Sequence, residues 1–346
     1  MLRTRSGCTS DGVLLPLPGV EMMRREASIG DATVSVVIPS YNCGHYVVKA
    51  VESVLKQSCP PQEIILVDDG STDHTREVLE PYRKAIVYLY QKNAGEPAAR
   101  NTGIRHASGE FIAFLDADDM WLPEKLELQM EYFARHPEVA LVYSDMAIFD
   151  ETGILHESVK DWLKVSMPSG FVFPQLFAET LFGSGTVVFR KSSIEKVGYF
   201  DETFFVGSDY EMWLRMARYF KFGYVDKPLL MYRQHASMAT RGLGLALQDG
   251  LPWEAKVITK ILSSYPEVRR ELGDSTVRRR LARPYFYLGY SCLDRGNHDE
   301  ARKLLSRSLR QWPWSLRCQL LYALMFLTPS QVSGLRNVYH RLFAQQ

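Results

Sequence analysis

The chain has 346 residues, of which 46% are hydrophobic, and a formal net charge of +1. A chain of this length can bury one large core or two domains. Positive and negative residues are interspersed, so the sequence lacks the basic face that nucleic-acid binding requires, and we expect no nucleic-acid partner.

The cysteines are odd in number and show no paired metal-ligand spacing: Cys8, Cys43, Cys59, Cys292 and Cys318. This pattern favours a reducing compartment over a disulfide framework, and we expect a cytoplasmic protein. Residues 1–32 contain the apolar run LLPLP (14–18), which is too short and too rich in proline for a signal peptide or a membrane span. We expect a poorly ordered N-terminal extension.

From Thr33 onward, apolar runs alternate with amphipathic segments. Strands are predicted at 34–38, 64–67, 86–90 and 111–115, and helices at about 46–57, from about 74 to 83, and from Pro97. Continuous apolar strands alternating with helices predict an α/β fold with a doubly wound, mostly parallel sheet. Ligands of such sheets bind outside the carboxyl ends of the strands.

The fourth strand leads into a loop with three carboxylates, Asp116, Asp118 and Asp119. Three close acids repel one another unless a cation lies among them. Mg²⁺ and Mn²⁺ bind carboxylate oxygens and keep positions open for phosphate oxygens. The alternative is an ordinary helix start near 121–123, with Asp118 or Asp119 as its cap.

Other polar clusters follow the neighbouring strands. Asp68 and Asp69 either satisfy turn amides or accept hydrogen bonds from a nucleotide base or ribose. Arg100 lies near the start of a helix that is approached through Gly95, where a guanidinium beside outward-pointing amides suits a diphosphate. Its alternative is a solvated helix face. Because these clusters follow consecutive strands, we favour ligand binding over the structural alternatives.

Four segments together resemble the family 2 glycosyltransferases of the GT-A fold: VSVVIPSYN (34–42), ILVDDGSTD (65–73), NAGEPAARNTG (93–103) and FLDADD (114–119). The resemblance covers about 33–240 and implies an inverting, metal-dependent enzyme that uses a nucleotide sugar. It also implies which residues bind the nucleotide sugar and the metal. Asp118 is the expected direct metal ligand, and the expected nucleotide-sugar residues are Pro39, Tyr41, Asp68, Asp69, Arg100 and Asp116.

The second half of 33–240 extends the resemblance. GSG (183–185) is similar to the family's glycine loop, in which Gly185 lets the backbone approach the sugar, although it also fits an ordinary turn. FVGSDYEMWLR (205–215) resembles the family's Glu-Asp motif, with Ser208 in place of the usual glutamate. Asp209 is then the expected catalytic base, at the start of a helix over 210–219. The alternative is a simple N-cap.

The segment MYRQHASM (231–238) resembles the family's closing segment, in which a histidine reaches the metal. This implies that His235 is a second metal ligand. An imidazole ligand favours Mn²⁺ over Mg²⁺ to some degree. The alternative is a solvated loop histidine.

After Thr240 the strand patterns end, so we expect a domain boundary between about 240 and 253 and an all-helical region over 241–346. Small and aromatic residues over about 282–315 follow the spacing of one tetratricopeptide-like unit. One unit cannot bury both its faces, so it is expected to pack on the catalytic domain, on a second copy in a homo-oligomer, or on a partner.

The stretch 319–327 is strongly apolar but too short to span a bilayer. A buried helix is the first interpretation. The alternative is peripheral contact with the inner face of the membrane, which nearby basic and aromatic residues favour. These residues are Arg307, Arg310, Arg317, Arg336, Trp312 and Trp314.

We expect sugar transfer from a nucleotide-sugar donor, in the first place a UDP-sugar, to a hydroxyl of a glycan or a lipid-linked acceptor, with Mn²⁺ or Mg²⁺ as cofactor. Two alternatives remain open. A nucleotidyltransferase normally has a glycine- and lysine-rich phosphate loop near its first strand, and none follows Ile38. A non-catalytic sugar- or protein-binding scaffold would use the helical tail.

Overall fold

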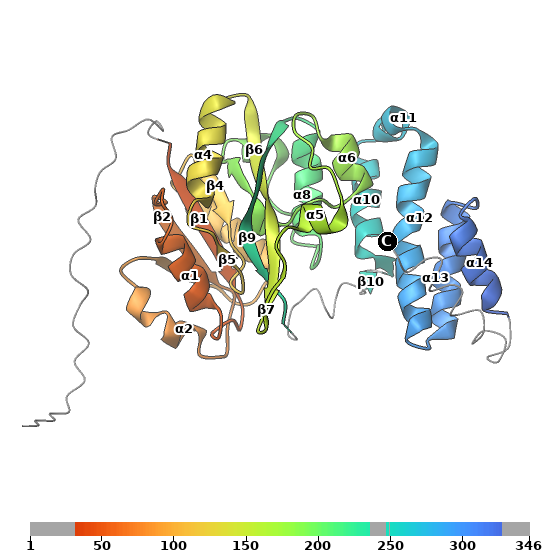
Figure 1. Ribbon diagram of the computed structural model, residues 1–346, viewed down its shortest axis with the longest axis horizontal. Helices are drawn as coiled ribbons and strands as arrows, with labels where there is room; N and C mark the ends of the chain where they lie inside the picture. Colours follow the sequence, from red (N-terminus) through yellow and green to blue (C-terminus); the bar gives the residue numbers. More distant parts are fainter. Residues whose placement is uncertain (1–31, 236–246, 249, 327–346) are drawn as a thin grey trace, which may run out of the picture.

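The computed structural model describes residues 32–235, 247–248 and 250–326. A twisted sheet with helices on both faces is followed by a group of helices packed against one side of it (Figure 1). The expected N-terminal extension lies outside the described residues except for Ala32. The strands of the main sheet are β1 Val34–Ser40, β2 Glu63–Asp68, β3 Val87–Tyr90, β4 Phe111–Phe114, β5 Met120–Trp121, β6 Val139–Asp150, β7 Gly153–His156, β8 Val188–Arg190 and β9 Lys221–Arg233.

Helices of the first part connect these strands. They are α1 Val47–Leu55, α2 Thr75–Val78, α3 Glu96–His106, α4 Lys125–Arg135, α5 Val159–Leu163, α6 Phe173–Ala178, α7 Ser193–Val197 and α8 Ser208–Ala217, with 3₁₀ turns η1 Glu80–Tyr82 and η2 Ser184–Thr186. The second part contains α10 Trp253–Ser264, α11 Val268–Leu272, α12 Asp274–Asp294, α13 His298–Gln311 and α14 Leu316–Leu324, after a short hairpin of β10 Leu247–Gln248 and β11 Leu251–Pro252.

The main sheet has the order β3-β2-β1-β4-β8-β6-β9-β5, with β7 paired to β6. The first four strands are parallel, as predicted, so their carboxyl ends lie at one edge. The second half is mixed, because β8 is antiparallel to β4 and β6, whereas β9 is parallel to β6.

The apolar runs form strands because both faces of the sheet are covered. Along β1, Val37 belongs to the core on one face, and Val36 and Ile38 belong to the core on the other. Leu66 and Ile65 of β2 alternate in the same way. This two-residue alternation is the one that a strand buried on both faces requires.

One local prediction and one alternative were wrong. The segment from 74 to 83 forms two short pieces, α2 and η1, rather than one helix. Helix α4 begins at Lys125 with Glu124 as its N-cap, so neither Asp118 nor Asp119 caps it. The chain before it is extended because Met120 and Trp121 pair with β9.

The helical region packs on the first part of the fold through α10, which precedes the expected tetratricopeptide-like unit. Val257, Ile258 and Ile261 of α10 belong to the same core as Met212 and Trp213 of α8. The core is therefore continuous across the expected boundary at about 240–253, part of which lies outside the described residues.

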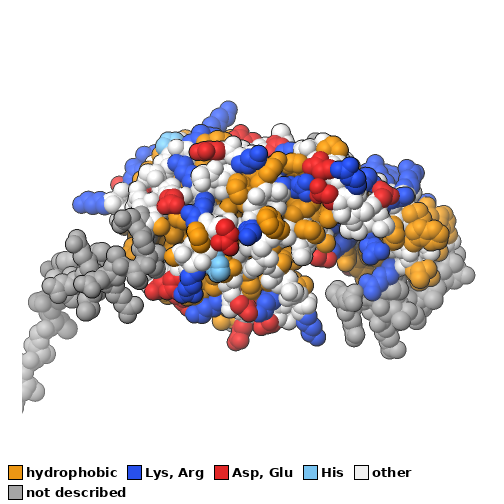
Figure 2. Space-filling view, turned by 90° about the horizontal axis from the view of Figure 1, so that it is seen from above, with side chains coloured by type: hydrophobic (Ala, Val, Ile, Leu, Met, Phe, Trp, Pro, Cys, Tyr) orange, Lys and Arg blue, Asp and Glu red, His pale blue; other side chains and the backbone are white. Residues whose placement is uncertain are grey.

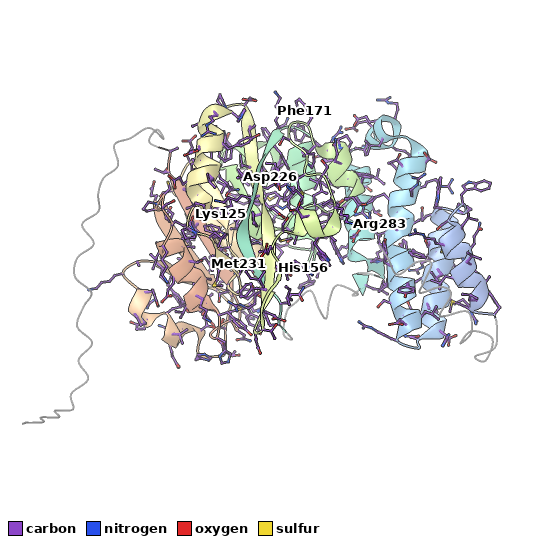
Figure 3. All side chains as sticks on the ribbon, in the orientation of Figure 1. Lys125, His156, Phe171, Asp226, Met231 and Arg283 are labelled. Carbon is purple, nitrogen blue, oxygen red and sulfur yellow. The ribbon has the colours of Figure 1, made fainter. Side chains whose placement is uncertain are left out.

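Charged contacts join the same two parts. Arg283 of α12 lies at the border between them (Figure 3) and pairs with Glu179. Arg280, also on α12, donates from Nε to the Phe177 carbonyl oxygen at 2.9 Å. The region expected to be all-helical also includes the β10–β11 hairpin.

Helix α14 covers most of the apolar stretch predicted at 319–327, whose last residue lies outside the described part. Cys318 and Leu321 are buried against Ala301 and Leu305 of α13, so one face of α14 is a core face, as first expected. Within the described residues, no helix is both long and apolar enough to cross a bilayer.

Candidate active site

The loops after β1 and β2 are fastened to each other at the carboxyl edge of the sheet. The backbone N–H of Asn42 donates to Ser71 Oγ at 2.9 Å, and the N–H of Thr72 donates to Asn42 Oδ1 at 2.8 Å. Asn42 has a φ of +52°, a conformation that asparagine tolerates better than most residues. Of the two nucleotide residues expected here, Pro39 is buried within β1 and Tyr41 is half-exposed just beyond it.

Asp69 holds the loop that leads into α3. Its Oδ1 accepts from Gln91 Nε2 at 2.7 Å and from the Ala94 N–H at 2.9 Å, and its Oδ2 accepts from the Gly95 N–H at 2.8 Å. Gly95 has a φ of +91°, which favours glycine. The buried carboxylate thus fixes the approach to the helix, and a direct contact with a nucleotide stays a prediction.

Asp68 is also buried and internally bonded. It accepts from the Ser71 N–H at 2.8 Å and from the Tyr88 hydroxyl at 2.5 Å. The pKa of Tyr88 is raised by burial and by this bond to the carboxylate. Asp68 therefore satisfies a turn amide, as one of the two interpretations expected. A contact of Asp68 with a nucleotide stays a prediction.

Arg100 is paired with acids of this chain. Its side chain is 4% exposed, and its Nη2 lies 2.9 Å from Asp116 Oδ1 and in close contact with Glu96 Oε1. The guanidinium carbon lies 5.6 Å from the ring centres of Phe114 and Phe200. The solvated-face alternative is wrong. Arg100 orients Asp116, and its own contact with a diphosphate stays a prediction.

Glu96 is a further acid of the site, which none of the sequence motifs indicated. Its side chain is 43% exposed. The surrounding protein atoms raise its pKa, the Arg100 guanidinium opposes that rise, and the charges of Asp116, Asp209 and Asp118 add to it. Its position four residues before Arg100 on one helix is a signal that could have identified the pair.

Asp118 and His235 are brought together from distant parts of the chain. The Nε2 of His235 lies 3.0 Å from Asp118 Oδ2. The Tyr46 ring packs on the imidazole with 4.7 Å between ring centres. Burial and the charge of Asp116 raise the pKa of Asp118, and its hydrogen bond with His235 opposes the rise. A buried carboxylate with an acidic neighbour favours an added positive charge.

Asp119 is hydrogen-bonded to the end of β9. Its Oδ1 accepts from the backbone N–H of Arg233 at 2.8 Å, while Arg233 Nε donates to the Asp118 carbonyl oxygen at 2.7 Å. Burial raises the pKa of Asp119 well above its usual value. Asp119 and Arg233 fasten the acidic loop to the end of β9, which places His235 beside Asp118.

The available donors fit a hard or borderline divalent metal whose coordination a ligand completes. Among the residues that the structure describes, no three His, Cys, Asp or Glu side chains gather as a metal-binding group. The Asp118–His235 pair supplies one carboxylate and one imidazole. Mg²⁺ and Mn²⁺ in nucleotide sites commonly use few protein ligands together with substrate phosphates and water.

Asp209 lies in the first turn of α8, whose N-cap is Gly207, so the N-cap alternative is wrong. Its Oδ2 accepts from Ser184 Oγ at 3.2 Å and its Oδ1 from the Tyr210 N–H at 2.7 Å. A carboxylate in the first turn is stabilised by the helix dipole. Ser208, which replaces the glutamate of the resembled motif, is buried.

Gly185 is explained by close packing. It lies in η2, where its carbonyl oxygen accepts from Trp121 Nε1 at 2.9 Å. A Cβ at this position would come within 2.9 Å of Leu230 Cδ2. Backbone approach to a sugar stays a prediction, but η2 also presents Ser184 to Asp209.

Glu211, a second acid on α8, is fully buried and unavailable as a base. It pairs with Arg215 at 2.9 Å and with Lys260 of α10 at 2.7 Å. Asp209 is the acid of this helix that remains partly accessible.

Comparison with known proteins identifies the family. Residues 35–198 match the family Glycosyl transferase family 2. WfgD of Escherichia coli, a UDP-Glc:alpha-D-GlcNAc-diphosphoundecaprenol beta-1,3-glucosyltransferase, is 33% identical over 190 residues, which cover 54% of this chain and 71% of WfgD. The chain belongs to glycosyltransferase family 2. The resemblance seen in the sequence is thereby confirmed at the level of the family.

One other relative of this family 2 glycosyltransferase is longer. An uncharacterized glycosyltransferase of Rickettsia felis is 35% identical over 205 residues, which cover 59% of this chain but 33% of the relative. The chain thus spans about a third of the length of that relative.

The fold is shared with S. aureus TarS. The structure of TarS residues 1–349 in complex with UDP matches 91% of this chain and 92% of that one, with a TM-score of 0.57 and 18% identity. This likeness confirms the GT-A type of fold for the family 2 glycosyltransferase.

Proposed function

We propose that this family 2 glycosyltransferase transfers a sugar from a UDP-sugar to an acceptor hydroxyl with inversion at the anomeric carbon. The observation that carries the proposal is the 3.0 Å contact between Asp118, at the carboxyl end of β4, and His235, just after β9. Two potential metal ligands meet at the strand edge where ligands of such sheets bind. The charge of Asp209, on α8, acts on Glu96 together with the charges of Asp116 and Asp118.

The proposed donor-binding region includes the loops after β1 and β2, which are hydrogen-bonded to each other. Asp69 holds the 93–95 loop and Arg100 holds Asp116, so both sides of the proposed diphosphate position are fixed before a ligand binds. The choice of UDP is supported by two proteins similar to this chain. WfgD is named for a UDP-Glc donor, and TarS has been crystallised with UDP and with UDP-GlcNAc.

Asp118 and His235 would hold the metal, with Asp116 contributing negative charge nearby. When bound, Mn²⁺ or Mg²⁺ supplies positive charge that stabilises the diphosphate leaving group. Imidazole among the ligands favours Mn²⁺.

Asp209 is the proposed general base. Its carboxylate accepts the proton of the acceptor hydroxyl as that oxygen forms a bond to the anomeric carbon, and the bond from that carbon to the diphosphate oxygen breaks. The electron pair leaves with UDP. One displacement inverts the configuration, and Ser184 positions the base by its hydrogen bond.

The proposed acceptor is a glycan or a lipid-linked sugar, used in building a polysaccharide of the cell envelope. WfgD, which acts on a diphosphoundecaprenol-linked sugar according to its name, supports this class. A cytoplasmic location agrees with the free thiols of Cys43, Cys59, Cys292 and Cys318.

The test is release of UDP from a panel of UDP-sugars, with and without Mn²⁺, in the presence of short glycan and lipid-linked acceptors. We expect release with one or a few donors, dependent on metal, and a product of inverted configuration by NMR. Absence of UDP release with every donor, or a product of retained configuration, would contradict the proposal.

A further inference from the structure

The last part of the chain has a charge unlike the rest. Residues 301–346 contain seven Lys or Arg and no Asp or Glu, whereas the whole chain has a net charge of +1. Five of these cations, Arg302, Lys303, Arg307, Arg310 and Arg317, belong to the described residues of α13 and α14 and their connection. All five are exposed.

Four of the five line one pocket between α13 and α14. Its lining residues are Arg302, Lys303, Ser306, Arg307, Arg310 and Tyr322. The lining includes no acid, and a hydroxyl from Ser306 and another from Tyr322 add hydrogen-bond donors. Cations and hydroxyls of this kind bind phosphate oxygens.

The outer face of α14 is mostly apolar. Leu316, Leu320 and Phe326 are 72%, 53% and 64% exposed, and Trp314, just before the helix, is 77% exposed. At about 100° per residue, Leu316, Leu320, Ala323 and Phe326 fall within one arc of about 120°, which also contains the exposed Gln319. Because Cys318 and Leu321 are buried on the opposite side, α14 is mostly apolar on both faces. A surface helix normally has a polar outer face.

The cationic pocket and the apolar face adjoin each other. The Arg302 guanidinium lies over the Phe326 ring at 5.3 Å from its centre, and the rings of Tyr322 and Phe326 are 5.4 Å apart. Figure 2 shows hydrophobic side chains gathered at the end of the molecule formed by the last helices, with Lys and Arg side chains beside them.

We propose that this α13–α14 surface binds the surface of an anionic phospholipid bilayer. The pocket cations contact lipid phosphates, while Trp314, Leu316, Leu320 and Phe326 enter the interface between head groups and acyl chains. Exposed aromatic and aliphatic residues next to Lys and Arg are the combination that interfacial helices use.

Two other occupants of this surface, a second copy of the chain and the segment 327–346, are disfavoured by their charge. A second copy in a two-fold dimer would place the same surface against itself and bring the pocket cations of both copies together, and of the four in each pocket only Lys303 has an acidic partner among the described residues, Glu300 at 3.4 Å. The segment 327–346 of this chain contributes Arg336 and Arg341 and no acid, so it cannot neutralise the pocket either. Anionic lipid supplies the missing charge.

Flotation of the full-length chain with vesicles tests the proposal without donor or acceptor. We expect the protein to float with vesicles of phosphatidylcholine containing about 30% phosphatidylglycerol, to float weakly with phosphatidylcholine alone, and to be released at about 500 mM salt. Because each Lys or Arg near an anionic surface is worth about fivefold in partitioning, Arg302→Gln/Arg310→Gln should reduce it about 20- to 30-fold. Leu316→Ser/Leu320→Ser should also reduce it.

Matched controls use exposed residues elsewhere. Lys84→Gln/Arg135→Gln removes two cations, and Ile154→Ser/Leu155→Ser removes two exposed apolar side chains, so both should partition like the wild type. The proposal is overturned by no flotation of the wild type, by equal flotation on both vesicle types, or by unchanged flotation of both surface variants. A dimer in solution that Leu316→Ser/Leu320→Ser dissociates would assign the surface to a second copy instead.

Discussion

The indole of Trp253 lies directly against Gly207. A Cβ added to Gly207 would come within 2.3 Å of Trp253 Cε3, and the same indole makes an edge contact with the Tyr210 ring at 6.3 Å between centres. Gly207 is the N-cap of α8 and has a φ of +81°. The first helix of the C-terminal region therefore shapes the turn that precedes Asp209.

Trp253→Ala should lower both stability and turnover. Burying a tryptophan contributes about 3–5 kcal/mol, and the half-buried position of Trp253 reduces this to about 2–3 kcal/mol of unfolding free energy. Turnover should fall because the turn before Asp209 loses its support, while UDP binding persists. Urea denaturation, UDP titration and steady-state kinetics measure the three effects. Trp314→Ala, at an exposed position, is the control, and equal loss in both variants would refute the packing role.

Asp118→Asn should weaken binding of Mn²⁺ and UDP together while the protein remains folded. The substitution removes one negative charge and a carboxylate oxygen from the proposed metal site. Isothermal titration of UDP in the presence and absence of Mn²⁺ measures the coupling. Unchanged Mn²⁺-dependent UDP affinity would remove Asp118 from the site. His235→Ala should give a smaller loss, because the carboxylate supplies the charge.

Asp209→Asn should leave donor binding intact and reduce turnover about 10²- to 10⁴-fold, which is the usual contribution of a general base. The asparagine keeps the shape but cannot accept the acceptor proton. Ser184→Ala is a useful comparison, because loss of one positioning hydrogen bond should cost less turnover than loss of the base itself. If Asp209→Asn retained more than about a tenth of the wild-type rate, the base would have to be another group.

Asp69→Asn should destabilise the 93–95 loop. The amide nitrogen of asparagine would face an N–H group that now donates to the carboxylate, so at least one donor among Gln91, Ala94 and Gly95 loses its partner. An unsatisfied buried donor costs about 1–3 kcal/mol, and the partial exposure of these residues places the expected loss at about 1 kcal/mol. Thermal and urea denaturation measure the loss, and a rise in the donor KM should accompany it. Wild-type stability in this variant would show that the three bonds are not needed.

The Asp201–Lys260 pair predicts a pH dependence of stability. Burial alone would raise the pKa of Asp201, but hydrogen bonds from Lys260 and Thr203 outweigh it and lower the pKa from 3.8 to about 2. The pair therefore contributes about 2 kcal/mol that is present above about pH 4 and is lost as the pH falls through 2.

Asp201→Asn should accordingly lose stability at pH 7, and its difference from the wild type should shrink as the pH falls from 4 to 2. Melting temperatures across this range measure the difference. Asp226→Asn is the matched control, because its partner Lys160 forms an exposed pair that contributes little. A difference that does not depend on pH would contradict the assignment.

The sequence predicted the first four parallel strands well because their apolar runs are continuous and local, whereas the parallel pair β6 and β9 was not predicted. β5 was missed because Met120 and Trp121 become a strand only by pairing with Met231 and Leu230 of β9, which lie far along the chain. Two residues carry no periodic signal of their own.

The site residues that lie within recognisable sequence motifs could be predicted. Asp118 and His235, placed at one metal by family resemblance, do lie in contact, although the metal itself stays a prediction. The burial of Arg100 was not predictable, because it depends on Phe200 from a distant loop as well as on Phe114 from the neighbouring strand. The contact of Trp253 with Gly207 has no local signal in the sequence.

The ion pairs of Lys260 limit how this enzyme can be recombined with its relatives. Lys260 of α10 lies 2.5 Å from Asp201 and 2.7 Å from the fully buried Glu211 of α8. A chimera that joined residues 33–240 to another protein's tail would leave that buried carboxylate with Arg215 alone, unless the new tail placed a cation at the same point. Keeping residues 33–240 together with their own helical region therefore preserves the Lys260 partner of the buried Glu211 carboxylate.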